Sequence, residues 1–211
     1  MKFNEYKYEH LDLEKIKKEF SELIKSFEKA ENVEGQVNAF DEIIKLRNHI
    51  ETMQTLVSIR HSVDTNDEFY DKENEYMDEI SPILFGFTND FYKALVNSKF
   101  KDELIKKYGK LLFDLAENTL KVFSNEIIPD AQEENRLSSK YSKLIASAKI
   151  DFDGKELNLS QMVPYTQSKD RNVRIEAAKK VAQFFAENQE EFDNIYDSLV
   201  KVRTKMAQKM G

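Results

Sequence analysis

The chain has 211 residues, of which 40% are hydrophobic and 34% are charged, a balance typical of a globular protein rather than a disordered one. It contains only 5 glycines and 3 prolines, so long helices are favoured over many short strands joined by turns. The formal net charge of −7 has the wrong sign for neutralising phosphates, which argues against nucleic acid as a partner.

The sequence also lacks features that mark other classes of protein. It has no cysteine, which excludes disulfides, thiolate metal ligands and thiol nucleophiles and fits a reducing compartment. Its first residues carry no apolar core of a signal peptide, and no run of about 18 apolar residues could cross a membrane. We therefore expect a soluble, cytoplasmic protein with no membrane partner.

Two long helices are expected first. Asp12 precedes apolar residues spaced by three and four over 13–27, and Asn32 precedes a similar pattern over 33–63. Both polar residues stand where a helix N-cap is expected. The polar segment 64–67 should end the second helix.

The middle of the chain continues the helical spacing with two interruptions. Residues 69–95 contain Pro82, which lacks a backbone N–H and crowds the preceding turn, so a kink or a break is expected there. Residues 100–123 contain Gly109 and fit either one interrupted helix or two short ones.

A helix followed by a β-hairpin is expected next. Asp130 with Glu133 three residues later has the spacing of a capping box. The expected buried side of this helix consists of Leu137, Tyr141, Leu144, Ile145 and Ala148. Two segments of alternating character flank Asp153-Gly154, a strong hairpin signal, so we expect one short β-hairpin at residues 149–159.

Further helices should complete the chain. Ser160 is expected to cap a short helix limited by Pro164, and Ser168 a longer one. The expected apolar face of the longer helix is Val173, Ala177, Val181 and Phe184, and that of the last helix, after a break near Asn188, is Phe192, Ile195, Tyr196, Leu199, Val202, Met206 and Met210. The pattern predicts a mainly α, multi-helix fold, and since no linker or repeat divides it, a single helical domain over 1–211.

No catalytic or metal-binding motif is found. A peptidase zinc site on a helix needs two histidines four residues apart with a glutamate between them, because that spacing puts both imidazoles on one face. The three histidines, His10, His49 and His61, do not meet this requirement. Nucleophile-elbow, P-loop and dinucleotide glycine patterns are absent too. We assign no catalytic, cofactor-binding or metal-binding residue.

Two other interpretations remain open. Residues 64–79 hold eight acids and one base, and Asp71, Glu75 and Asp78 would share a helix face that could hold a cation or a basic peptide, although a solvated face is the plainer interpretation. Residues 170–178 resemble the second helix of a HEAT-type repeat, which suggests a stand-alone interaction scaffold. Only one such unit is visible, whereas a solenoid needs several.

Several stretches together resemble the N-terminal portion of oligoendopeptidase F and its relatives, zinc metallopeptidases of the thimet oligopeptidase type. These stretches are residues 47–65, 67–70, 133–135, 144–159 and 168–211. The resemblance implies a mostly helical lobe that forms one wall of a deep channel for short peptides, with zinc on another lobe.

The family's zinc-binding histidines and glutamate base have no counterpart in this sequence, so the catalytic zinc domain is expected to be absent. The resemblance thus implies zinc and short peptides for the full-length parent only, and a missing catalytic lobe as the partner of this chain. By itself, the chain is expected to be inactive.

Overall fold

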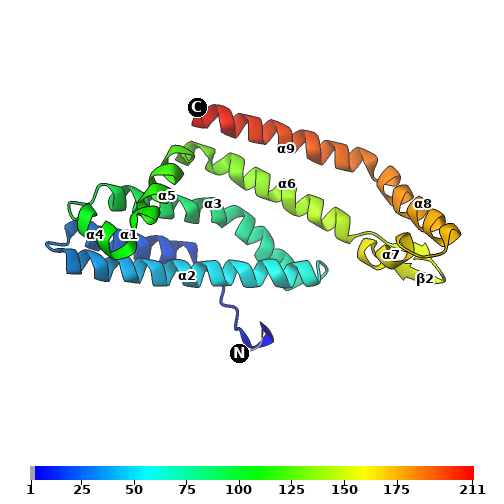
Figure 1. The fold of residues 1–211 in the computed structure, drawn as a ribbon, viewed down its shortest axis with the longest axis horizontal. Helices are drawn as coiled ribbons and strands as arrows, with labels where there is room; N and C mark the ends of the chain where they lie inside the picture. Colours follow the sequence, from blue (N-terminus) through cyan, green and yellow to red (C-terminus); the bar gives the residue numbers. More distant parts are fainter. Residues whose placement is uncertain (1–2) are drawn as a thin grey trace. The chain divides into compact units, whose positions relative to one another are not determined.

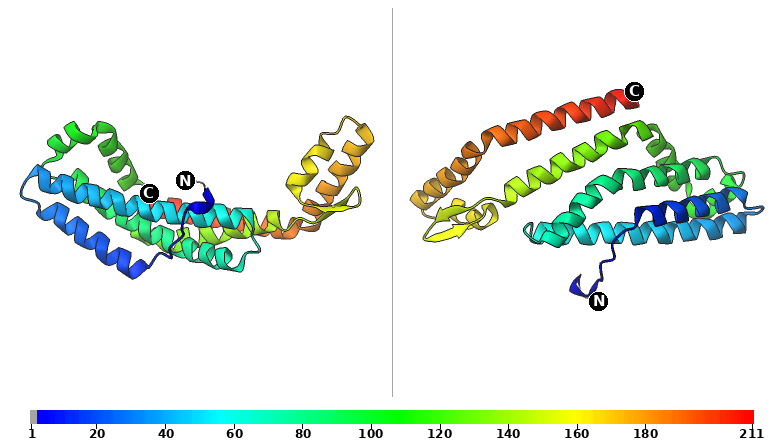
Figure 2. Two further views of the ribbon diagram at one scale, coloured as in Figure 1. Left: turned by 90° about the horizontal axis from the view of Figure 1, so that it is seen from below. Right: turned by 180° about the vertical axis from the view of Figure 1, so that it is seen from behind.

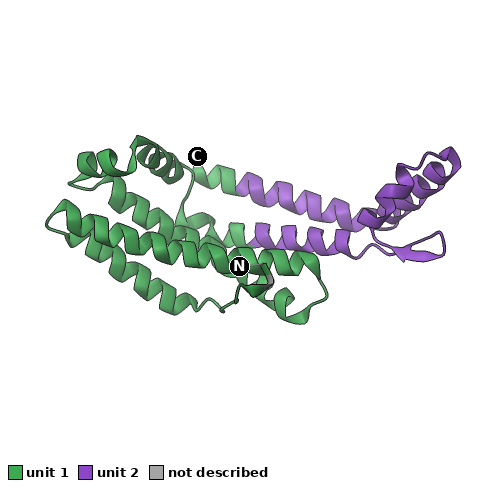
Figure 3. Ribbon diagram, turned by 60° about the horizontal axis from the view of Figure 1, so that its bottom comes forward, with its two compact units in different colours: residues 1–132, 206–211 green, residues 133–205 purple. Residues whose placement is uncertain are grey.

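The computed structural model describes residues 3–211, and in these residues it contains nine α-helices and one two-stranded sheet, which confirms the mainly α prediction (Figure 1). The helices and strands are grouped into two compact units (Figure 3). Unit 1 comprises the described residues up to Gln132 together with Met206–Gly211, and unit 2 is Glu133–Lys205.

Three long helices form the body of unit 1. They are α1 (Leu13–Lys29), α2 (Val33–Val63) and α3 (Glu68–Val96), and each packs against the other two (Figure 2). The side chain of Asp12 accepts a hydrogen bond from the Lys15 amide at 3.0 Å, and Asn32 accepts one from Gly35 at 2.8 Å. Both predicted N-caps are confirmed, because each cap directly precedes a strongly periodic apolar segment.

Aromatic side chains fill much of the core of unit 1. Phe20, Phe27, Phe91 and Phe113 are fully buried. The rings of Phe27 and Phe91 meet edge to face with centroids 6.0 Å apart, and Phe40 stacks on Tyr108 at 4.1 Å. Such pairs add to the apolar area that these large side chains remove from water.

A kink or a break is expected at Pro82 from the sequence. Helix α3 continues through Pro82, so the break is wrong, whereas the bend of the helix along its course in Figure 1 agrees with the kink. Ile80 and Leu84 are buried on either side of the proline. Burial of two such side chains is worth about 1.5–3 kcal/mol each, which offsets the backbone hydrogen bond that proline removes. Packing therefore keeps the helix continuous through the proline.

Two short helices follow, as one of the two sequence interpretations anticipated. They are α4 (Lys101–Tyr108) and α5 (Lys110–Lys121), and Gly109 between them has φ +88° and ψ +151°. Only glycine adopts this conformation without strain.

Helix α6 (Ile128–Ala146) begins earlier than expected, after the 3₁₀ turn η2 (Asn125–Ile127). Asp130 lies inside its first turn, is only 4% exposed, and forms an ion pair with Lys209. Glu133 pairs with Arg136 at 2.7 Å. The expected capping box is therefore wrong, because Asp130 meets a cation 79 residues away that local spacing cannot reveal.

The β-hairpin follows α6 in unit 2. Strands β1 (Ile150–Phe152) and β2 (Lys155–Leu157) pair antiparallel, with Ile150 opposite Leu157. Asp153 and Gly154 have φ of +52° and +69°, the signs of a type I′ turn. The predicted hairpin is confirmed at its centre, while its expected last residue, Leu159, belongs to the next helix.

Three helices complete the chain: α7 (Leu159–Thr166), α8 (Arg171–Glu187) and α9 (Gln189–Met210). Asn158 caps α7 through a reciprocal capping box with Gln161, and Asp170 caps α8. The expected caps at Ser160 and Ser168 are each wrong by two residues, and α7 runs two residues beyond Pro164.

The core of unit 2 is small and joins the hairpin to α7 and α8. It consists of Ala148, Ile150, Leu157, Met162, Ala177 and Phe184. The predicted face of α8 is confirmed, as is the break at Asn188, whose amide donates to the Phe184 carbonyl at 2.8 Å. Tyr141 and Tyr196 are 46% and 72% exposed, so their assignment to the core is wrong.

Within unit 2, α6 and α9 run side by side in opposite directions (Figures 1 and 2). Arg203 of α9 donates to Glu134 of α6 at 2.7 Å, and Lys140 pairs with Glu191. The exposed ring of Tyr141 meets Phe192 edge to face at 5.9 Å.

Candidate functional site

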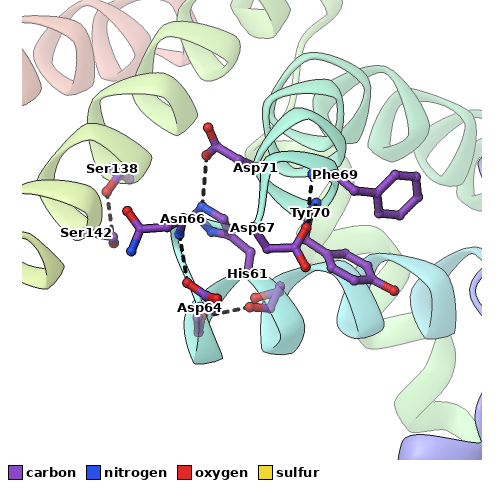
Figure 4. Close-up of polar contacts among 11 residues, drawn as sticks. His61, Asp64, Asn66, Asp67, Phe69, Tyr70, Asp71, Ser138 and Ser142 are labelled. Carbon is purple, nitrogen blue, oxygen red and sulfur yellow. Dashed lines mark hydrogen bonds and ion pairs between the residues drawn. The ribbon is translucent and has the colours of Figure 1, made fainter.

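The three histidines lie apart. His10 places Nδ1 2.9 Å from Glu73 Oε2 and stacks on Tyr76, whereas His61 is buried and places Nε2 3.1 Å from Asp71 Oδ1 (Figure 4). His49 is exposed on α2. Over residues 3–211, no three His, Cys, Asp or Glu side chains are grouped so that they could hold a metal ion.

Two acids of the segment 64–79, Asp64 and Asp67, build the turn between α2 and α3 (Figure 4). Asp64 Oδ1 accepts from the Asn66 amide at 3.0 Å, and Asp67 Oδ1 accepts from the Phe69 and Tyr70 amides at 3.0 and 3.1 Å. These bonds satisfy backbone donors that a helix start leaves free. They give Asp64 and Asp67 a structural role at the turn; within residues 3–211 the acids of this segment, Asp71, Glu75 and Asp78 included, form no group that could hold a metal ion.

The segment 6–11, here called the N-terminal strap, is bound across α2 and α3. Tyr76 donates to the Leu11 carbonyl at 2.8 Å, and Arg60 donates to the Tyr6 carbonyl at 2.6 Å. Tyr8 donates to Glu73, and burial, reinforced by this hydrogen bond, raises the pKa of the Tyr8 hydroxyl well above its usual value. Sequence analysis missed the strap, because its contacts are polar and it has no apolar periodicity.

A cavity of about 340 Å³, here called the α2–α3 groove, lies along these two helices. Its apolar lining is Phe20, Ile50, Leu84 and Phe85, and its polar lining includes Arg47, Glu51, Gln54, Ser81, Thr88, Tyr92 and Thr119. The volume is at the lower end of the range of about 300–1,000 Å³ typical of small-molecule sites. Apolar walls with a few polar groups can orient a small ligand.

Arg47 is the cation of this groove. Its guanidinium carbon lies 5.5 Å from the centroid of the Tyr92 ring, and its side chain is 20% exposed. Its nearest carboxylate belongs to Glu51, at 3.6 Å, and Gln54 is held by a 2.9 Å hydrogen bond to Ser81. Sequence reasoning did not single out Arg47, because the groove combines residues of four helices.

A second cavity, of about 490 Å³, lies where Phe3 and Tyr6 face α2. Its lining from α2 is Asn48, Glu51, Thr52, Thr55, Leu56 and Ile59. It contains no basic side chain in its lining, so it offers little to an anionic ligand.

The fold is thus of the mainly helical class, with one hairpin and with no metal-binding group in the part of the chain that is described. A comparison with protein families matches residues 3–123 to the peptidase M3 N-terminal domain. The chain belongs to this family, which confirms the resemblance found in the sequence.

Solved structures agree over the full length of the chain. PZ peptidase A, solved with an inhibitor, is 50% identical with a TM-score of 0.97, and an oligoendopeptidase F from Bacillus anthracis str. Ames is 47% identical with a TM-score of 0.98. A further oligoendopeptidase F is 45% identical with a TM-score of 0.97. A search of curated proteins gave no match.

The alignment covers 100% of this chain but only 37%, 39% and 37% of those three solved chains. The chain therefore corresponds to less than two fifths of the length of the peptidases that it matches. None of the helices within residues 3–211 combines the length and the apolar character needed to cross a bilayer.

Proposed function

We propose that this chain is the N-terminal helical part of an oligopeptidase of the M3 family and contributes one wall of a channel that admits short peptides. The observation that supports this is the full-length alignment at 45–50% identity with a TM-score of 0.97–0.98 to two oligoendopeptidase F structures and PZ peptidase A. We propose that residues 1–211 act as one lobe, although two compact units are distinguishable.

Zinc belongs to the full-length parent in this proposal. A bound zinc ion polarises a scissile carbonyl and lowers the pKa of its water. The described residues do not fit it: His10 and His61 are each engaged with a different carboxylate, and His49 is exposed on α2. We therefore expect the chain to need a catalytic partner lobe, and since it contains no cysteine, a reducing cytoplasm suits it.

The alternative of a HEAT-type scaffold has less support. Helix α8 packs on α7 and on strand β1, so its neighbours differ from the stacked helix pairs of a solenoid.

A cleavage assay tests the proposal. The pure chain with zinc and a quenched fluorescent peptide should show no chelator-sensitive cleavage, and cleavage should appear when the remaining part of an oligoendopeptidase F relative is added. The same remaining part alone is the control and should cleave more slowly or lose its selectivity for short peptides. Chelator-sensitive cleavage by this chain alone, or no effect of adding it, would contradict the proposal.

A further inference from the structure

Arg47 is a cation without a hydrogen-bonded partner. Within residues 3–211 its guanidinium donates no hydrogen bond, and Glu51 lies beyond hydrogen-bond distance at 3.6 Å. The guanidinium carbon lies 5.5 Å from the centroid of the Tyr92 ring, a cation–π contact that uses none of the guanidinium N–H groups as hydrogen-bond donors to an oxygen. A planar fork of donors fits the two oxygens of a carboxylate.

Other polar groups in the groove are also available. The hydroxyls of Thr88 and Thr119 form no hydrogen bond within the described residues, and both side chains are half-buried. Gln54 uses its amide nitrogen to bind Ser81, and no hydrogen bond to its amide oxygen is found in residues 3–211. The groove therefore offers donors for a carboxylate and an acceptor for an amide N–H.

The rest of the groove lining is apolar. Phe20, Ile50 and Leu84 are buried, while Phe85 is partly exposed and meets Phe123 edge to face at 5.0 Å. A ligand side chain of aliphatic or aromatic type would remove this surface from water. The volume of about 340 Å³ restricts the ligand to a small one.

We propose that the α2–α3 groove binds a free carboxylate next to an apolar side chain and an amide, the chemistry of the C-terminal residue of a short peptide. Arg47 binds the carboxylate, Thr88 and Thr119 donate to it, and the wall formed by Phe20, Leu84 and Phe85 receives the side chain. Glu51 weakens binding, because its carboxylate lies 3.6 Å from the Arg47 guanidinium and repels the carboxylate of the ligand. This site concerns the chain alone and does not depend on the proposed peptidase function.

Titration of the whole chain followed by ¹H–¹⁵N NMR tests the site. The probe is N-acetyl-glycyl-leucine, and its C-terminal amide is the control ligand. One ion pair and two hydroxyl hydrogen bonds to the carboxylate in a small groove lead us to expect a Kd of about 0.1–1 mM for the acid and binding at least tenfold weaker for the amide. Shifts should centre on residues that line the groove.

Three variants distinguish the roles of the charges. Arg47→Met should remove the preference for the acid, with a loss of about tenfold in affinity, and Glu51→Gln should increase affinity about threefold. Arg171→Met is the matched control, since Arg171 is exposed in unit 2, and it should change nothing. The NMR spectra themselves show whether each variant is folded.

Some results would overturn the proposal. These are equal binding of acid and amide, an unchanged Kd in Arg47→Met, or weaker binding in Glu51→Gln. A second probe, the α-amide of N-acetylglutamic acid, carries its only carboxylate on the side chain and therefore tests whether the groove binds a side-chain carboxylate. If it binds and the dipeptide acid does not, the groove recognises an acidic side chain of a partner and not a peptide terminus.

Discussion

At the scale of single residues, the ion pair of Lys209 with Asp130 joins side chains 79 residues apart in sequence. Lys209 Nζ also donates to the Glu126 carbonyl at 3.0 Å. The Asp130 side chain is 5% exposed, so Lys209→Met leaves a buried carboxylate without this cation. We expect a loss of about 3 kcal/mol in the free energy of unfolding, measured by urea denaturation, at the low end for a broken buried pair because the Lys209 side chain is 30% exposed.

A surface pair serves as the control for that prediction. Lys201 pairs with Asp197 one helical turn away, and both side chains are more than 60% exposed. Lys201→Met should cost less than about 1 kcal/mol. Asp130→Asn in the Lys209→Met background should recover part of the loss, because a neutral amide is easier to bury. Equal losses in both lysine variants would count against a buried pair.

The Tyr108 hydroxyl makes the stability of the protein depend on pH. Burial, then the hydrogen bond to Asp41 at 3.1 Å and its charge, raise the pKa of Tyr108 to about 12. The unfolded value is about 10, so the folded state favours the protonated hydroxyl. This contribution to stability is complete below about pH 10 and is lost as the pH rises towards 12.

Urea denaturation midpoints measured between pH 10 and 12 test whether stability falls as the pH rises. Tyr108→Phe should lose less stability between pH 10 and 12 than the wild type, because it has no hydroxyl to ionise there. Asp41→Asn should lower the pKa of Tyr108, seen as tyrosinate absorbance that appears at lower pH. Identical pH profiles for wild type and Tyr108→Phe would refute the assignment.

At the scale of elements, Gly109 separates α4 from α5 by its backbone conformation alone. A Cβ built at this position meets nothing within 4 Å, so a substitution acts through strain and not through a clash. Gly109→Ala should cost about 1–3 kcal/mol in the free energy of unfolding.

The hairpin glycine provides a contrast. Gly154, with φ +69°, occupies a left-handed turn position that asparagine tolerates. Gly154→Asn should therefore be nearly neutral in the same urea experiment, whereas Gly109→Asn should be as costly as Gly109→Ala. A neutral Gly109→Ala would show that the joint between α4 and α5 can relax.

The elements themselves were largely predictable from sequence. Asp12 and Asn32 were found as caps because strong apolar periodicity begins immediately after them, and Asp153-Gly154 because its turn chemistry is local. Ser160 and Ser168 are the wrong caps, since Asn158 stands two residues before Ser160, Asp170 stands two residues after Ser168, and both are equally good cap residues. Asp130 could not be assigned, because its partner is distant in sequence.

The candidate groove was not predictable in the same way. Phe20, Arg47, Tyr92 and Thr119 come from four different helices, and none belongs to a short motif. Their proximity follows from helix packing, which periodicity alone does not determine. Arg47 is one of several cations of α2, together with Lys45 and Arg60, so the sequence carries no signal that singles it out.

At the scale of the whole molecule, the two units have separate cores. Phe91 is buried in unit 1 and Phe184 in unit 2. Truncation of a buried phenylalanine costs about 3–5 kcal/mol and should destabilise the unit that contains it. We expect Phe184→Ala to accelerate hydrogen exchange in 148–184 and leave α2 unchanged, and Phe91→Ala to do the reverse. Uniform acceleration in both variants would mean that the two cores unfold as one.

The course of the chain through its two units affects how it responds to a cut. It enters unit 2 after Gln132 and returns to unit 1 after Lys205, so unit 2 is an insertion and not a tail. The ion pair of Lys209 with Asp130 joins the chain segments that flank this insertion. The ion pair of Arg203 with Glu134 joins residues near its two ends in the same way. A protease that nicks the backbone at Asp153-Gly154 should therefore give two bands on a denaturing gel and one particle by size exclusion.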